Sequence, residues 1–359
     1  MTGGKKVTVL MPCYNAAAYF QEAVDSVLNQ SYTNLEILLI DDGSKDNTAE
    51  LINKYSAIDS RIVPVFNERN MGLIKTLNKG VKLATGDFIA RMDADDISHP
   101  DRIKMLVNEF ELDPKLDVIS AGFYYFSYDG FVKRQAHPKA LQSKSLHFVS
   151  FFCTPVNHPC VVVKASVFKA NPFDDQYIHS EDYEIFSRLL ADGYRFKNYA
   201  SPLYFLRMNP ESVSYRFEKI QISTHTKISA RNIENYFNKR FDFFLHKVMI
   251  NRISFNVSYR LLNEALETLD MLRNDFIKNE KPDASVIAEI DEFLIEQKID
   301  ILLQSFKSAR FKHKGVILWN IFAHLPLFIH KRGSRYFLSK LPFMNRNLPE
   351  LPKFKSSVI

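Results

Sequence analysis

Four short apolar segments alternate with amphipathic helical patterns within roughly the first hundred residues of the chain. The apolar segments have the length and the turn boundaries of strands, and they cover residues 7–11, 36–40, 62–66 and 88–92. Between them, apolar residues recur at helical spacing, as Phe20, Val24 and Val27 do. Repeated strand–helix–strand units build a mainly parallel sheet with helices on its faces. The pattern therefore predicts an α/β fold.

Each predicted strand is followed directly by polar residues. In chain order these include Tyr14, Asp42, Arg69 and Asp95. Because the carboxyl ends of parallel strands meet at one edge of a sheet, where open α/β sheets bind their ligands, we expect these side chains to share one crevice. The alternative is that loops are polar in any α/β domain and that these residues have no common role.

The polar run after the fourth strand is Asp93-Ala94-Asp95-Asp96. Carboxylates this close repel one another unless they are solvated, hydrogen-bonded or bridged by a cation. A small set of oxygen ligands suits Mg²⁺ or Mn²⁺, which share their coordination with substrate phosphates. The chain has neither a Gly-x-x-x-x-Gly-Lys-Ser/Thr loop nor a Gly-x-Gly-x-x-Gly run after the first strand, which argues against P-loop hydrolases and dinucleotide-binding oxidoreductases. The acidic run therefore predicts a divalent cation that holds a diphosphate.

Two local signals set the expected helix boundaries in this region. Asn47 followed by Glu50 predicts a capping pair at the start of a helix. Gly86 stands where a glycine commonly ends a helix.

Five segments, in this order and spacing, resemble glycosyltransferase family 2. They read VTVLMPCYN, SVLNQSY, LIDDGSKDNT, NMGL and RMDADD, at residues 7–15, 26–32, 39–48, 70–73 and 91–96. The resemblance covers residues 5–215. It implies a GT-A fold, which is a Rossmann-like, mainly parallel sheet with flanking helices. It also implies a nucleotide-diphosphate sugar donor and transfer with inversion at the anomeric carbon.

The resemblance assigns roles to individual positions of this sequence. Pro12 and Tyr14, with Asn15 beside them, would line the nucleoside pocket, and Asp42 would hydrogen-bond the base. Arg69 would approach the diphosphate or the base. Within the acidic run, Asp93 would contact the ribose or sugar and Asp95 would reach a Mn²⁺ or Mg²⁺ ion, with Asp96 as a further candidate ligand.

Transfer to a hydroxyl also requires a general base, because a sugar hydroxyl is a weak nucleophile. The candidate segment is Ser180-Glu181-Asp182-Tyr183-Glu184, which opens a predicted helix. The resemblance places an acidic pair here and assigns the base to Asp182, beside Glu181. The alternative is that both acids only complement the positive end of that helix.

The chain departs from the family pattern after the predicted base. Many relatives carry an Arg-x-His there, whereas this chain reads Arg207-Met208-Asn209. Asparagine is a poorer metal ligand than imidazole, so metal binding is expected to be weaker or to use another ligand. His179 is one candidate substitute, although a solvated or core role is the alternative. His158 is expected either to touch substrate or to orient the backbone.

At 359 residues the chain is long enough for two units. We predict a GT-A nucleotide-sugar-binding and catalytic domain at 1–215 and a helical C-terminal region at 216–359. Within the latter, helices are expected at 241–272 and 284–306, joined by Lys281-Pro282-Asp283. Three scattered cysteines and the absence of an apolar leader at the start favour a cytoplasmic protein.

The C-terminal tail is basic and aromatic. Residues 305–359 hold eleven Lys or Arg and one acid, which gives a net charge of +10. The apolar run at 316–329 contains Trp319 but is too short and too broken to span a bilayer. Such a tail suits an anionic membrane face, and the alternative is a buried helix that docks on the catalytic domain. Nucleic acid is not an expected partner, because the chain carries no known binding module.

Taken with the resemblance, these observations predict an inverting hexosyltransferase. Its donor would be a UDP-sugar carrying a hexosyl or N-acetylhexosaminyl unit. Its acceptor would be a hydroxyl of a glycan, in a lipid-linked surface-polysaccharide or lipopolysaccharide precursor at the inner face of the cytoplasmic membrane. The alternative is a catalytically inactive nucleotide-sugar-binding protein that acts as an assembly partner at the membrane. Replacement of the family histidine by Asn209 favours this alternative, and retention of Asp42, Asp93, Asp95 and Asp182 disfavours it.

Overall fold

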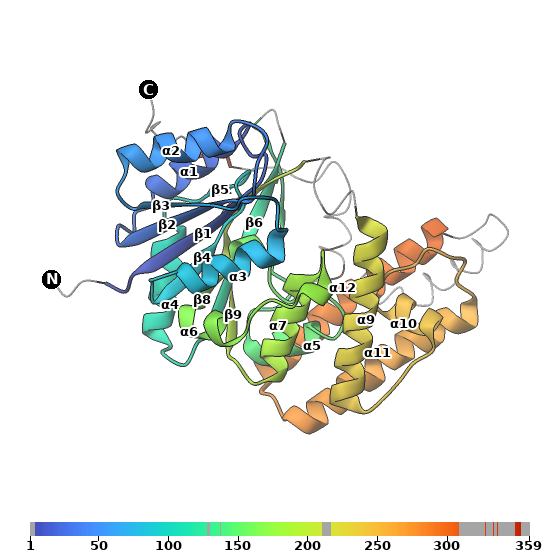
Figure 1. Cartoon of the computed structure of the whole chain (residues 1–359). Coiled ribbons are helices and arrows are strands. Elements are labelled where there is room, and N and C mark those ends of the chain that lie inside the picture. The colour runs from blue at the N-terminus through green and yellow to red at the C-terminus, as the bar shows by residue number, and fades with distance from the viewer. Residues whose placement is uncertain are drawn as a thin grey trace. The chain divides into compact units, whose positions relative to one another are not determined.

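The computed structural model describes residues 4–127, 130–136, 138–209, 217–308, 327, 333, 336 and 349–352. The chain divides into two compact units. The first consists of 1–138, 156–216 and 347–359, and the second of 139–155 and 217–346 (Figure 1). The division shows compactness and not activity, so the catalytic domain at 1–215 stays a prediction.

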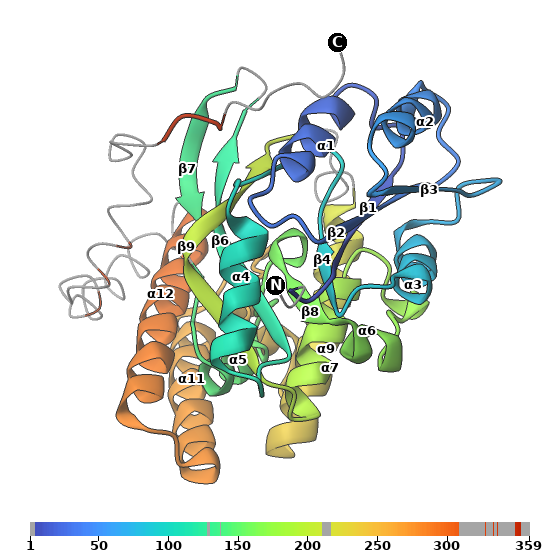
Figure 2. The same ribbon diagram turned by 90° about the vertical axis from the view of Figure 1, so that its left-hand side faces the viewer.

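A single mixed sheet forms the centre of the first unit (Figure 2). Its strands are β1 Val7–Cys13, β2 Leu35–Asp41, β3 Ile62–Phe66, β4 Phe88–Arg91, β5 Ile97–Ser98, β6 Val118–Phe126, β7 Val132–Ala136, β8 Val162–Lys164 and β9 Phe196–Arg207. Their order is β3-β2-β1-β4-β8-β6-β9-β5, and β7 pairs with β6. All four predicted strands are confirmed, and they pair in parallel. Beyond β4 the sheet is mixed, since β8 is antiparallel to both β4 and β6 while β6 and β9 are parallel.

Helices pack on both faces of the parallel part of the sheet, although the edge strand β3 stays partly exposed. The helices of the first unit are α1 Phe20–Leu28, α2 Thr48–Ile58, α3 Leu73–Leu83, α4 Arg102–Leu112, α6 Ala165–Ala170 and α7 Glu181–Ala191, with 3-10 turns at His158–Cys160 and Asp175–Tyr177. Val9 and Met11 of β1 lie in one core with α1, α2 and α4. Leu10 points to the opposite face, where α3 packs so closely that a Cβ at Gly80 would collide with it. Both faces of β1 are buried, which explains its continuous apolar sequence.

The two predicted boundary signals work differently from the expectation. Asn47 makes no side-chain cap on α2. Asp46 takes that role, because its carboxylate accepts hydrogen bonds from Thr48 N at 3.1 Å and Thr48 Oγ1 at 2.6 Å. Gly86 does not end α3, whose C-cap is Ala84. Gly86 instead lies against β1, where a Cβ would come within 2.6 Å of the Thr8 nitrogen.

The second unit is helical in its described part. Its helices are α5 Ser143–Val149, α9 Glu218–Phe237, α10 Phe243–Met249, α11 Tyr259–Glu280 and α12 Ala284–Ser308. Buried aromatic rings fill it; for example, Phe148 packs edge-on against Phe276 of α11 and Phe293 of α12. Glu289 of α12 holds the residues just before α5 by accepting hydrogen bonds from the N–H groups of Leu141 and Gln142 at 2.9 and 3.1 Å.

The predicted helix at 241–272 is wrong as one element. α10 ends at Met249, and α11 starts after Ser258, whose side chain caps it by accepting a hydrogen bond from Leu261 N. The linker prediction is confirmed, since Lys281 ends α11 in the left-handed region and Asp283 accepts hydrogen bonds from the first turn of α12. Most of the basic tail lies outside the described residues, including 309–326. Within the part of the chain that is described, no helix combines the length and apolarity needed to cross a bilayer.

Candidate active site

Three aspartates gather in the loop between β4 and β5. Oxygen atoms of Asp93, Asp95 and Asp96 all lie within 4.8 Å of one another. Among the described residues, this is the one group of His, Cys, Asp and Glu side chains close enough to share a metal ion. Asp93 and Asp95 are partly exposed, whereas Asp96 is buried.

Buried arginines compensate the charge of this acidic loop. Arg91, the last residue of β4, forms an ion pair with Asp93. Arg207, the last residue of β9, donates from its backbone N to Asp96 Oδ1 at 2.7 Å and from Nε to the Asp95 carbonyl at 2.7 Å. Arg102, the first residue of α4, donates from Nη2 to the Arg91 carbonyl at 2.7 Å and so holds the end of β4 in place. The last residues of β4 and β9 are therefore arginines that lie beside the acidic loop, where they offset part of its negative charge.

Two carboxyl groups of the acidic loop, those of Asp95 and Asp96, have pKa values above the ordinary range of aspartate. Burial and the neighbouring Asp93 raise the pKa of Asp95 to about 6. Burial and Asp95 raise the pKa of Asp96 well above its ordinary value, although Arg207 N and the Tyr204 hydroxyl hydrogen-bond it. Oxygen-only donors that repel one another at partly exposed positions fit a hard divalent cation. Asp93 and Asp95 fit a ligand role best, and Asp96 supports the loop from inside.

The loops after β2 and β3 are joined by Asp42. Its buried carboxylate accepts hydrogen bonds from Asn67 Nδ2 at 2.8 Å and from the N–H groups of Met71 and Gly72 at 2.9 Å each. Asp42 N donates to the Cys13 carbonyl at 2.8 Å, which ties this junction to the end of β1. Asp42 thus organises the loop after β3, and its contact with a nucleobase stays a prediction.

Gly43 makes the same junction sterically tight. It has a φ of +70°, and a Cβ there would lie 2.6 Å from the carbonyl carbon of Arg69 and 2.7 Å from Asn70 N. We expect Gly43→Ala to lower the free energy of unfolding by about 2 kcal/mol or more, because backbone strain and a backbone clash add together. Gly193→Ala is the matched control, since Gly193 has a φ of +85° but open space around its Cβ position. It should cost only about 1 kcal/mol. Equal losses for the two variants in urea unfolding would contradict the clash.

The other residues predicted to bind the nucleotide-sugar lie at or near the ends of β1 and β3. Tyr14 has 47% of its surface exposed. Asn15 adopts a φ of +49°, and its Oδ1 accepts a hydrogen bond from Lys45 N at 2.9 Å, which joins the loops after β1 and β2. Pro12 lies within β1, opposite Ile40 of β2. Arg69 lines a cavity of about 680 Å³ formed by 66–71 with Lys75 and Lys79.

The predicted base lies where the sequence places it, in the first turn of α7. Burial and the neighbouring Asp182 raise the pKa of Glu181 to about 7. Burial also raises the pKa of Asp182, whose Oδ1 accepts a hydrogen bond from Tyr183 N at 2.7 Å. The positive charge of Arg91 opposes this rise in the pKa of both acids, but it is the smaller effect. Arg91 therefore acts electrostatically on both the acidic pair and the acidic loop.

The supporting arginines were not predicted from the sequence. Arg91 had a signal, because an arginine that ends an apolar strand needs a buried partner. Arg207 was noted only as part of the segment 207–209 that departs from the family pattern, and its support of the acidic loop was not predicted. Nothing in the sequence near Arg102 indicates its role. His179, the candidate substitute for the family histidine, is not among the residues whose side chains lie close enough to share a metal ion, which are Asp93, Asp95 and Asp96. His158 is buried against the rings of Phe173 and Phe186, and burial lowers its pKa well below the ordinary value.

Comparison with known proteins gives this arrangement a family. The sequence profile described as "Glycosyl transferase family 2" matches residues 8–176. An uncharacterized glycosyltransferase of Haemophilus influenzae is 32% identical over 247 residues, which span 65% of this chain and 75% of that protein. The chain belongs to glycosyltransferase family 2. The predicted family is thereby confirmed.

Two solved structures share the fold of this chain. The crystal structure of residues 1–349 of S. aureus TarS in complex with UDP-GlcNAc has a TM-score of 0.52 and 16% sequence identity, over 93% of this chain and 92% of that one. The mannosyltransferase PcManGT of Pyrobaculum calidifontis, in complex with GDP-Man and Mn²⁺, has a TM-score of 0.50 and 16% identity, over 94% and 86%. This confirms the predicted GT-A fold with its helical C-terminal region.

Proposed function

We propose that this family 2 protein transfers a hexosyl or N-acetylhexosaminyl unit from a UDP-sugar to a hydroxyl of a glycan acceptor, with inversion. One set of contacts carries the proposal, because it links the end of β4, which leads into the acidic loop, to the helix that carries the Glu181–Asp182 pair. Arg102 Nη2 donates to the carbonyls of Arg91 and Pro159 at 2.7 and 3.0 Å. The ring of His158, next to Pro159, lies 5.8 Å from the ring of Phe186, one turn after Asp182 on α7. In this proposal, a cation bound by the acidic loop would offset the charge of the diphosphate leaving group. The nearby acidic pair would accept the proton of the acceptor hydroxyl. UDP is favoured because TarS was crystallised with UDP-GlcNAc, while the GDP-Man complex of PcManGT makes GDP the competing choice.

Asp93 and Asp95 would hold Mn²⁺ or Mg²⁺, with Asp96 behind them. When bound, the ion supplies positive charge that offsets the negative charge of the departing diphosphate. Pro12, Tyr14 and Asn15 would form one wall of the nucleoside pocket, and Asp42 would keep the loop that carries Arg69 in position. Mn²⁺ in the PcManGT complex supports a divalent cation in this fold.

The reaction would be a single displacement. Asp182 accepts the proton of the acceptor hydroxyl as that oxygen attacks the anomeric carbon from the face opposite the nucleotide. A new carbon–oxygen bond forms while the bond from the anomeric carbon to the diphosphate oxygen breaks, and the nucleoside diphosphate leaves with the electron pair. Glu181, which is buried while Asp182 is half-buried, would keep the pair partly protonated.

The acceptor we propose is a lipid-linked precursor of a surface polysaccharide or lipopolysaccharide. The basic, aromatic tail at 305–359 supports work at an anionic membrane face, because Trp and Phe flanked by Lys and Arg bind such surfaces. The site of action would then be the inner face of the cytoplasmic membrane. A truncation before Phe306 that binds anionic vesicles as strongly as the full chain would contradict this role of the tail.

A nucleotide-binding experiment tests the donor side. We expect UDP with Mn²⁺ to raise the melting temperature of the full chain more than GDP, CDP or dTDP, and UDP without a metal to have little effect. A ligand at about 100 times its dissociation constant adds about 2.7 kcal/mol to the free energy of unfolding. Asp95→Asn should abolish this stabilisation, whereas Asp270→Asn on α11 should retain it. No response to any nucleotide with Mn²⁺ or Mg²⁺ would overturn the proposed donor site.

A further inference from the structure

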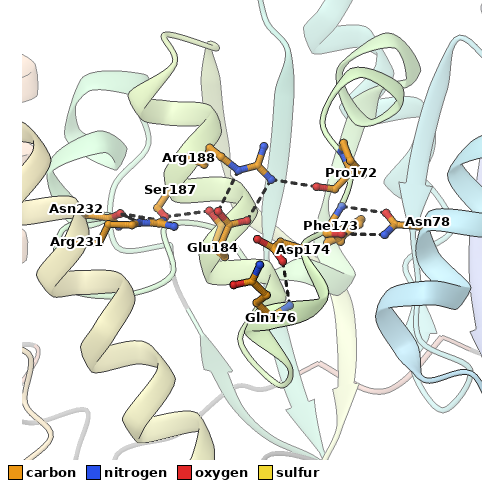
Figure 3. A network of polar contacts seen from close by, with 10 residues as sticks. All are labelled: Asn78, Pro172, Phe173, Asp174, Gln176, Glu184, Ser187, Arg188, Arg231 and Asn232. Carbon is orange, nitrogen blue, oxygen red and sulfur yellow. Dashed lines mark hydrogen bonds and ion pairs between the residues drawn. The ribbon is translucent and has the colours of Figure 1, made fainter.

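The segment that leads into α7 is held at two adjacent residues, Pro172 and Phe173 (Figure 3). Asn78 of α3 makes a two-way contact with the backbone of Phe173. Its Nδ2 donates to the Phe173 carbonyl at 2.8 Å, and the Phe173 N–H donates to Asn78 Oδ1 at 2.9 Å. From the other side, Arg188 of α7 donates from Nη2 to the Pro172 carbonyl at 3.0 Å. A side chain of α3 and a side chain of α7 therefore grip the same short segment.

Arg188 belongs to the helix that carries the proposed base. Glu184, one turn earlier on α7, orients it through a two-point ion pair of 3.0 Å at Nε and 3.1 Å at Nη2 (Figure 3). Glu184 is buried, so the pair has little freedom to rearrange. The α7 side of the grip is thus within two turns of Glu181 and Asp182, on one continuous helix.

Helix α3 is tied to the proposed donor side as well. Lys79, next to Asn78, donates from Nζ to Asn67 Oδ1 at 2.6 Å, and Asn67 donates to the Asp42 carboxylate at 2.8 Å. Asp42 also holds the N–H of Gly72, the residue that precedes α3. One helix therefore contacts both the loop that carries Arg69 and the segment that leads to the base.

We propose that Asn78 is a positioning residue that sets the Glu181–Asp182 pair relative to the donor. The proposal depends on the function proposed above, because it assumes that Asp182 is the base. A catalytic group must be held in reacting geometry, and a shift of about 1 Å can cost on the order of a hundredfold in rate. The Phe173 ring also packs 5.4 Å from the ring of His158 and 5.3 Å from that of Phe168. We expect these contacts to keep the segment docked when the Asn78 amide is removed, so that the variant loses the exact position of the segment and keeps its fold.

Asn78→Ala in the full chain tests this, with Asn53→Ala on the exposed face of α2 as the matched control. We expect kcat for transfer to fall about tenfold or more in Asn78→Ala, while the dissociation constant for UDP with Mn²⁺ stays within about threefold of wild type. Asn53→Ala should leave both unchanged. Arg188→Lys, which keeps a positive charge but loses the planar fork, should lower kcat in the same direction.

Hydrogen exchange separates failure of this proposal from failure of the proposed function. In Asn78→Ala, amides in peptides covering 172–186 should exchange faster, while those covering the acidic loop at 91–98 should be unchanged. Wild-type kcat, or unchanged exchange at 172–186, would overturn the positioning role even if the enzyme transfers sugar as proposed. An equal loss of UDP affinity and kcat would also overturn it, since that is the result of a general structural defect. If Asn78→Ala does not fold, the same readouts on Arg188→Lys decide the question.

Discussion

Asp182→Asn should lower the rate of sugar transfer by about 10²- to 10⁴-fold and leave nucleotide binding nearly unchanged. Asparagine cannot accept the proton of the acceptor hydroxyl. It does keep the side-chain oxygen that accepts the hydrogen bond from Tyr183 N at 2.7 Å, so the first turn of α7 should retain its geometry. The measurement is kcat with saturating UDP-sugar, Mn²⁺ and acceptor, beside the dissociation constant for UDP measured by calorimetry.

Asp192→Asn is the matched control for this prediction. Asp192 is an exposed aspartate at the C-terminal end of the same helix, so its substitution changes the charge of α7 without touching the acidic pair. It should retain wild-type kcat. Near-normal turnover in Asp182→Asn would remove Asp182 from the base role. If Glu181→Gln then abolished transfer, the base would be Glu181. If neither substitution lowered transfer, the acidic pair would have no role as the base.

The parts of this protein that the sequence predicts are those governed by local patterns. Short apolar runs bounded by turn residues located β1 to β4, and apolar residues at helical spacing located α3. The runs of β1, β2 and β4 are continuous because both faces of these strands are buried, whereas the edge strand β3 is partly exposed. The acidic run and the Glu181–Asp182 pair were visible for a related reason, since charged residues beside apolar segments need an explanation. The break between α10 and α11 was missed because apolar residues continue through 250–257, where Ile253 and Val257 are buried without forming a helix.

The parts that were missed depend on contacts between distant positions. Arg207 supports Asp96 from 111 residues away, and Asn78 holds Phe173 from 95 residues away. Asn78 looks like an ordinary polar position on an amphipathic helix until the fold places the segment before α7 against it. One sequence cannot reveal such pairs, because neither partner has a local pattern of its own. The sequence could therefore indicate candidate functional groups, whose roles stay predictions, but it could not indicate the residues that contact and support them.

The second large effect concerns the stability of the folded protein as a function of pH. Burial raises the pKa of Glu181 from an ordinary value of 4.5 to about 7. Between these two values the folded state binds a proton that the unfolded state has lost, so the free energy of unfolding falls as the pH rises. The stabilising contribution is fully present below about pH 4.5 and is lost once the pH passes about 7. Above that pH, the folded protein carries a buried carboxylate charge at a cost of about 3 kcal/mol.

Glu181→Gln removes this cost because glutamine has the shape of the protonated acid and carries no charge. We expect the variant to be more stable than wild type by about 2 kcal/mol or more at pH 8 and by less than about 1 kcal/mol at pH 5. Urea unfolding of the nucleotide-free protein at the two pH values measures both differences. Glu267→Gln, at an exposed position on α11, should show no such pH-dependent gain. A Glu181→Gln variant that is less stable than wild type at pH 8 would mean that the ionised carboxylate has a compensating partner. The same result would weaken the role of Glu181 in keeping the acidic pair partly protonated beside the donor.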